Sequence, residues 1–98
     1  MSRDAVLAIL RAHEASLRQR GVKRAALFGS TARGEATAGS DIDIMIEIDP
    51  AAHVDLYGYV AVTHYIEGLF SVPVDVAERD QLLEPVRRTA EQDAVYAF

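Results

Sequence analysis

Three aspartates and a glycine-serine pair are the residues of this sequence best suited to chemistry. Asp41 and Asp43 are separated by one isoleucine, Asp75 lies inside a later apolar run, and ten residues separate Gly29-Ser30 from Asp41. Carboxylate oxygens are preferred ligands of hard divalent cations. A glycine lets a phosphate approach the backbone, and a serine offers it a hydroxyl and an N–H. The layout predicts a phosphate site beside a three-carboxylate metal site.

Asp41 and Asp43 are expected on one face of a strand, because side chains alternate along β-structure. The opposite face would carry the isoleucines at 42, 44, 46 and 48. Two residues of strand separate Cα atoms by roughly 6.5 Å, and two carboxylates at that distance repel by about 2.5 kcal/mol at an effective dielectric near 20. A cation would offset that repulsion.

A pair of divalent ions about 3.5 to 4 Å apart would suit these acids, as in two-metal phosphoryl-transfer sites. All-oxygen ligands favour Mg²⁺, with Mn²⁺ as the other candidate. Zinc more often binds cysteine or histidine. This chain has no cysteine, and its histidines, His13, His53 and His64, show no ligand spacing. A zinc site is therefore not expected.

A half-exposed strand with two solvated acids would show the same Asp-Ile-Asp pattern. The third aspartate favours the metal site. The valines at 72, 74 and 76 share one face of a second expected strand, which leaves Asp75 on the other face. If the strands at 42–48 and 74–77 are neighbours, Asp41, Asp43 and Asp75 converge.

A strand is also expected over residues 23–28, and Gly29-Ser30 marks its end. A short helix over residues 31–35 would add backbone N–H groups to an anion site there, so binding of a triphosphate is expected at that corner. Most glycine-serine pairs are ordinary turns. The distance from this pair to the aspartates makes it informative.

Arginine would have to help the metals neutralise phosphate charge, because the sequence has no Walker lysine and no G-x-G-x-x-G fingerprint. Arg33 is the candidate, and its alternative role is a surface ion pair with Glu35 or another acid. Ser40, directly before Asp41, is expected to line the same nucleotide site.

The remaining sequence predicts three longer helices. The first spans residues 4–20 with His13 on its apolar face, as a residue at the border between core and surface. The second runs from about 52 to 70 after an Asp49-Pro50 start, and the last runs from about 85 to 94. Inward-facing positions are expected at Val54, Tyr57, Ala61, His64 and Leu69 of the second. The order of elements predicts an α/β fold with a single small mixed β-sheet, helices mainly on one face and an open metal-bearing face. Residues 1–98 are expected to form one domain.

The composition narrows the functional classes. The formal charge is −5, and no lysine-rich run is present to attract a nucleic-acid backbone, so direct DNA binding is not expected. A cysteine-free chain is typical of a reducing, cytoplasmic location. No apolar stretch approaches the length of a membrane span.

Residues 29–44, GSTARGEATAGSDIDI, resemble the G-S-x10-D-x-D signature of the DNA polymerase beta-type nucleotidyltransferase superfamily. The small size, the ARGEA stretch and the VPVDV segment are similar, more narrowly, to minimal nucleotidyltransferases (MNT), the antitoxins found beside HEPN-domain toxins. The resemblance implies a polymerase beta-like fold and transfer of AMP from ATP, with Mg²⁺, to a tyrosine of a HEPN RNase toxin. It also implies that Asp41 and Asp43 hold both metals, and that Asp75 binds the acceptor-side metal and helps to deprotonate the hydroxyl.

Two other functions stay open at this stage. One is a non-catalytic antitoxin that masks its toxin by binding. The other is a nucleotidyltransferase for a small alcohol such as an aminoglycoside. The sequence does not identify the acceptor.

Overall fold

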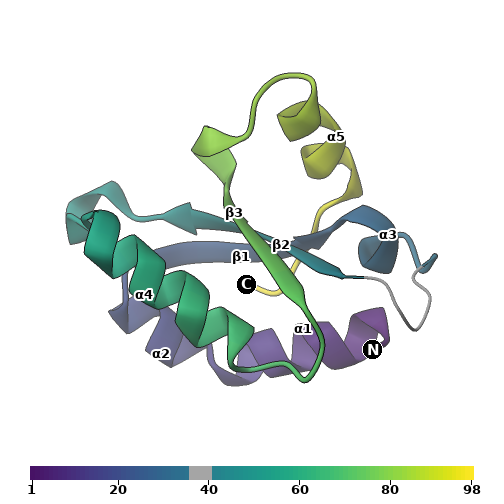
Figure 1. The fold of residues 1–98 in the computed structure, drawn as a ribbon, viewed down its shortest axis with the longest axis horizontal. Coiled ribbons are helices and arrows are strands. Elements are labelled where there is room, and N and C mark those ends of the chain that lie inside the picture. Colours follow the sequence, from purple (N-terminus) through teal and green to yellow (C-terminus); the bar gives the residue numbers. More distant parts are fainter. Residues whose placement is uncertain (36–40) are drawn as a thin grey trace.

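A four-stranded mixed sheet in the order β3-β2-β1-β4 organises the chain (Figure 1). The computed structural model describes residues 1–35 and 41–98. The strands are β1 (Val22–Phe28), β2 (Ile42–Ile48), β3 (Val74–Glu78) and β4 (Val95–Tyr96). β2 pairs antiparallel with β1 and parallel with β3, and β4 pairs antiparallel with the other edge of β1. The predicted α/β fold with one small mixed sheet is confirmed.

The helices are α1 (Arg3–Ala12), α2 (Glu14–Gln19), α3 (Gly29–Ala32), α4 (Leu56–Glu67) and α5 (Val86–Asp93), with short 3-10 turns η1 (Pro50–Ala52) and η2 (Arg79–Gln81). In Figure 1, α1, α2 and α4 lie on one side of the sheet and α5 lies on the other. None of the helices in the described residues is long and apolar enough to cross a bilayer.

The main core fills the space between the sheet and α1, α2 and α4. Alternation places Ile42, Ile44 and Ile46 of β2 on this face, and all three are fully buried. Their partners include Leu10 of α1 and Ile66 of α4. The odd positions of β2, which include Asp43, therefore face the side occupied by α5.

A second, smaller core lies under α5. Its buried members are Ala26, Met45 and Ala90. Ala90 is buried against Met45, which holds α5 over one part of this sheet face. The region around Asp43 lies beside the part that α5 covers.

The helix predictions need three corrections. The first helix is interrupted at His13, whose Nδ1 lies 2.9 Å from the Ile9 carbonyl oxygen, and it continues as α2. The helix expected over 31–35 begins earlier, at Gly29. The helix expected from 52 is shorter, because Asp49 caps only η1 and Asp55 caps α4, accepting a hydrogen bond from the Gly58 N–H at 2.7 Å.

The predicted inward face of the second long helix is wrong within α4 itself, whereas the predicted positions Val54 and Leu69 are half-buried but lie outside α4. Tyr57, Ala61 and His64 are exposed, and Val62 and Ile66 are the buried residues of α4. Apolar residues lie on all sides of this helix. Their spacing therefore did not identify the face that packs on the sheet. The two-residue strand β4 was not predicted.

Candidate active site

Asp43 lies at the centre of the candidate site, flanked by two neighbouring strands. It pairs with Asp75 across the parallel β2–β3 ladder and with Phe28 across the antiparallel β1–β2 ladder. Paired residues on adjacent strands point to the same side of a sheet, about 4.8 Å apart. The strands at 42–48 and 74–78 are thus neighbours, which was the condition for the aspartates to converge, and Asp43 and Asp75 stand side by side.

Asp41 is the third acid of the site, and we call Asp41, Asp43 and Asp75 the acidic group. It lies one residue before β2, and alternation places it on the side of Asp43. Asp41 and Asp75 are exposed, whereas Asp43 is half-buried. The site therefore has one partly desolvated carboxylate between two that reach solvent.

Asp43 is partly buried, and the carboxylates of Asp75 and Asp41 are close enough to it for their charges to change its pKa. Burial raises the pKa of Asp43 above its ordinary value. The charges of Asp75 and Asp41 raise the Asp43 pKa further, and the Arg33 guanidinium partly lowers it. An acid whose charged form is disfavoured by burial and by like charges is stabilised by a cation.

The donor set fits divalent cations. In residues 1–35 and 41–98 no three acidic or histidine side chains are gathered tightly enough to hold a metal as they stand. The fit rests on the chemistry and register of the acids. All the ligands would be carboxylate oxygens, the preferred partners of Mg²⁺ and Mn²⁺.

Gly29 is joined to this acidic group by close packing. Its φ is +75°, and a Cβ built there would overlap Oδ2 of Asp43. Glycine is required for both reasons, since side chains disfavour that φ and would displace the carboxylate. The sequence indicated that Gly29 makes room for a phosphate, and the structure shows that it also makes room for Asp43.

Ser30 is the second residue of α3, directly after Gly29, and it is half-buried. The α3 turn starts where β1 ends, next to Asp43, so Gly29 and Ser30 lie at the same end of the sheet as the acidic group. Ser40 lies outside the described residues.

Arg33, at the C-terminal cap of α3, makes two ion pairs. Its Nε lies 3.0 Å from Oε2 of Glu35, and its Nη1 lies 2.6 Å from Oδ2 of Asp93. The ion-pair alternative for Arg33 is therefore observed. Its guanidinium is also close enough to Asp43 to lower that pKa, so Arg33 lies beside the site as well.

A cavity of about 300 Å³ lies between α3 and α5, next to Gly29 and Arg33. Its other lining residues are Phe28, Pro85, Val86, Thr89, Ala90 and Asp93. Sequence reasoning did not include α5 in the site. Asp93 is 60 residues from its partner Arg33, and no motif connects the two.

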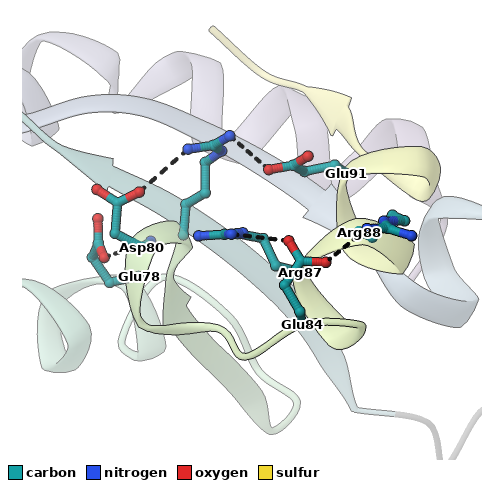
Figure 2. Close-up of polar contacts among 7 residues, drawn as sticks. Glu78, Asp80, Glu84, Arg87, Arg88 and Glu91 are labelled. Carbon is teal, nitrogen blue, oxygen red and sulfur yellow. Dashed lines mark hydrogen bonds and ion pairs between the residues drawn. The ribbon is translucent and has the colours of Figure 1, made fainter.

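Ion pairs hold α5 and the preceding loop in place. Arg79 contacts Glu91 of α5 at 2.6 Å and Asp80 at 3.2 Å. Glu84 accepts from Arg87 at 2.9 Å and pairs with Arg88 at 3.4 Å (Figure 2). These contacts, with the Ala90 packing, set the far wall of the cavity.

Residues 10–97 match the protein family described as "Nucleotidyltransferase domain". A Methanocaldococcus jannaschii protein, provisionally named a protein adenylyltransferase, is 39% identical over 90 residues, which cover 90% of each chain. The protein adenylyltransferase MntA of Thermococcus cleftensis is 32% identical over 94 residues, which cover 95% of this chain and 93% of that protein.

Solved structures share the fold. A structure provisionally described as a minimal nucleotidyltransferase superposes with a TM-score of 0.80 at 27% identity, covering 97% of this chain and 95% of that one. A toxin-antitoxin structure with AMP-PNP has a TM-score of 0.69 at 18% identity, with 90% and 72% coverage. An MNT antitoxin in complex with a tri-AMPylated HEPN toxin of Shewanella oneidensis has a TM-score of 0.63 at 15% identity, with 94% and 71% coverage. At these identities the last two likenesses establish the fold alone.

Proposed function

This chain belongs to the nucleotidyltransferase domain family, and on that premise we propose that it transfers AMP from ATP to a tyrosine hydroxyl of a HEPN-domain toxin. The main support for this proposal is that Asp43 and Asp75 are paired on adjacent strands, with Gly29 packed closely against Asp43. Its partner class is supported by related proteins named protein adenylyltransferases and by the MNT antitoxin that shares this fold.

The reaction requires one bond to form and one to break. The acceptor oxygen attacks the α-phosphorus of ATP, the bond from that phosphorus to the bridging oxygen breaks, and pyrophosphate leaves. The phenol proton passes to a base, and Asp75 is the candidate because it is an exposed carboxylate beside Asp43. Such transfers depend on in-line positioning and on charge neutralisation.

Asp41, Asp43 and Asp75 would hold two Mg²⁺ ions, or Mn²⁺, which would neutralise phosphate charge and lower the pKa of the attacking hydroxyl. Gly29 and Ser30 would receive the phosphates at the start of α3.

Arg33 would leave its exposed ion pairs to contact the phosphates, because pairs of that kind are worth only about 0.2–1 kcal/mol. Ser40 is assigned to the same nucleotide site from the sequence. A cysteine-free chain is consistent with a cytoplasmic reaction.

The test is transfer of label from ATP marked at its α-phosphate to a purified HEPN-domain protein from the same organism, the candidate acceptor. Wild type should label it in the presence of Mg²⁺, and Asp41→Ala with Asp43→Ala should abolish labelling. Asp80→Ala is the matched control, since Asp80 is an exposed acid whose ion-pair partner is Arg79. A double variant that labels as well as wild type would refute the mechanism.

Two other outcomes would identify the alternatives. Neutralisation of the toxin that survives the double substitution, without labelling, would indicate an antitoxin that acts by masking. A labelled aminoglycoside or other small alcohol, formed with no protein acceptor present, would indicate a small-molecule nucleotidyltransferase.

A further inference from the structure

A groove lies at the opposite end of β3 from the acidic group. Its volume is about 430 Å³, and it lies between the end of β2, the start of α4 and the η2 turn. The residues that line it are Ile48, Val54, Asp55, Leu56, Tyr59, Glu78 and Gln81. We call it the α4 groove.

Large apolar side chains stand exposed on the first turns of α4, and one of them, Leu56, lines the groove. Leu56 is 73% exposed, Tyr57 is 86% exposed and Val60 is 42% exposed. Positions 56 and 60 are one helical turn apart and position 57 is adjacent, so the three form one patch on the first turns of α4. A contiguous exposed apolar patch beside a groove is typical of a protein interaction site.

Two carboxylates that line the α4 groove, Asp55 and Glu78, accept backbone hydrogen bonds and are not paired with a basic side chain among the described residues. Asp55 accepts from the Gly58 N–H at 2.7 Å, and Glu78 accepts from the Asp80 N–H at 2.7 Å. Figure 2 shows the contrast, because Glu84 contacts Arg87 and Arg88 whereas the contact drawn for Glu78 is to Asp80.

The α4 groove is close to the acidic group. Glu78 and Asp75 are three residues apart on β3, which corresponds to roughly 10 Å of strand. Burial raises the pKa of the Tyr59 phenol, a hydrogen bond with the Glu78 backbone partly lowers that pKa, and the charges of Glu78 and Asp75 raise it. β3 is an edge strand, so a protein seated in the groove could extend along that open edge toward Asp75.

We infer that the α4 groove docks the protein that accepts AMP, through a segment in which an apolar side chain is flanked by lysine or arginine. The inference rests on the proposed function, since the occupant is the acceptor. The apolar side chain would contact Leu56 and Tyr57, and the cations would pair with Asp55 and Glu78. Docking there would hold the acceptor near the site without using any residue of the acidic group.

The apolar part of the inference is tested with a pair of exposed leucines. Leu56→Ser should weaken binding of the purified HEPN-domain protein by at least about tenfold, as expected for an interface anchor. Leu83, which is 79% exposed and outside the groove, is the matched control, and Leu83→Ser should bind within about twofold of wild type. Isothermal calorimetry gives both constants, and thermal unfolding checks that both variants are folded. Equal binding by Leu56→Ser and wild type would overturn the inference.

The charged part is tested without disturbing the two caps. Asp55→Asn and Glu78→Gln remove the charges, while their amide oxygens can still accept the hydrogen bonds from Gly58 and Asp80. Wild-type binding should weaken as salt rises, and the double variant should lose most of that dependence. Glu84→Gln, which removes an acid already paired with arginine, should leave the dependence unchanged. A double variant with the salt dependence of wild type would overturn the role assigned to Asp55 and Glu78.

The same variants separate docking from catalysis. If wild type labels the partner and Leu56→Ser labels it equally at partner concentrations below the Kd, AMP transfer stands and docking at the α4 groove fails. If wild type binds the partner in a manner that depends on Leu56 but transfers no label, docking stands and AMP transfer fails. If sedimentation shows a dimer of this chain that Leu56→Ser dissociates, with partner binding intact, the occupant is a second copy and the inference fails.

Discussion

Gly29 and Asp43 are packed so closely that position 29 has no room for a side chain. The glycine lies at the start of α3 with φ +75°, and the Asp43 carboxylate occupies the space that a Cβ would need. The backbone at the end of β1 and the Asp43 carboxylate are therefore in direct van der Waals contact.

Gly29→Ala should destabilise the protein and reduce nucleotide transfer. The strain of a positive φ costs a non-glycine residue about 1–2 kcal/mol, and displacement of the Asp43 carboxylate adds to it. Gly34→Ala is a matched control, because Gly34 has the same φ but a Cβ added there would meet nothing within 4 Å. Urea unfolding should show a larger loss for Gly29→Ala than for Gly34→Ala, and only the former should lose activity. Equal losses in both variants would mean that the contact with Asp43 has no effect.

Asp43→Asn should stabilise the metal-free protein at neutral pH. The pKa of Asp43 is raised in the folded state, so the folded protein binds the proton more tightly than the unfolded chain does. Stability therefore falls as the pH rises from the ordinary aspartate pKa, about 3.9, through the raised folded value. The asparagine variant lacks this loss. Its gain over wild type should shrink as the pH falls toward 4, as measured by unfolding in EDTA, with Asp80→Asn showing no gain.

Mg²⁺ should raise the melting temperature of the wild-type protein. A cation that binds only the folded state adds about 1.4 kcal/mol at ten times its Kd. Asp75→Asn should lose most of this shift, since Asp75 is the neighbour of Asp43 in the ladder. Asp80→Asn should keep it. Thermal unfolding with and without MgCl₂ measures the effect. If the shift is undiminished in Asp75→Asn, Asp75 is not a metal ligand.

Arg33→Ala should raise the KM for ATP several-fold more than Asp93→Asn does. Both substitutions break the 2.6 Å ion pair between Arg33 and Asp93, but only the first removes a cation from the nucleotide site. Loss of the exposed pair should cost about 0.2–1 kcal/mol of stability in either variant. Steady-state kinetics separates the two roles, because an Arg33 that serves only as a tie to α5 would give the same KM in both.

The strands were predictable because their patterns are local. Alternating isoleucines fix β2, the valines around Asp75 fix β3, and one neighbouring pair of strands is enough to bring Asp43 and Asp75 together. The helices were harder. α4 is apolar on both the covered and the exposed side, so Val62 and Ile66 could not be told from Leu56 and Tyr57 by spacing.

The contribution of α5 could not be predicted for a different reason. It packs through a small residue, Ala90, and reaches the site through one long-range ion pair between Asp93 and Arg33. Neither feature leaves a periodic or motif-like signal. Only the tertiary arrangement shows that a wall of the cavity beside Gly29 comes from the C-terminal helix.

The two faces of the sheet are packed unequally, so they differ in the substitutions that they can accept. Within residues 1–35 and 41–98, the hydrophobic cluster on one face contains fourteen buried apolar residues and the cluster on the other contains three. Substitutions on the isoleucine side will be selected for volume and shape. On the side of Asp43 the thin packing leaves side chains free to change with the ligand, so relatives could diverge in specificity there while keeping the same scaffold.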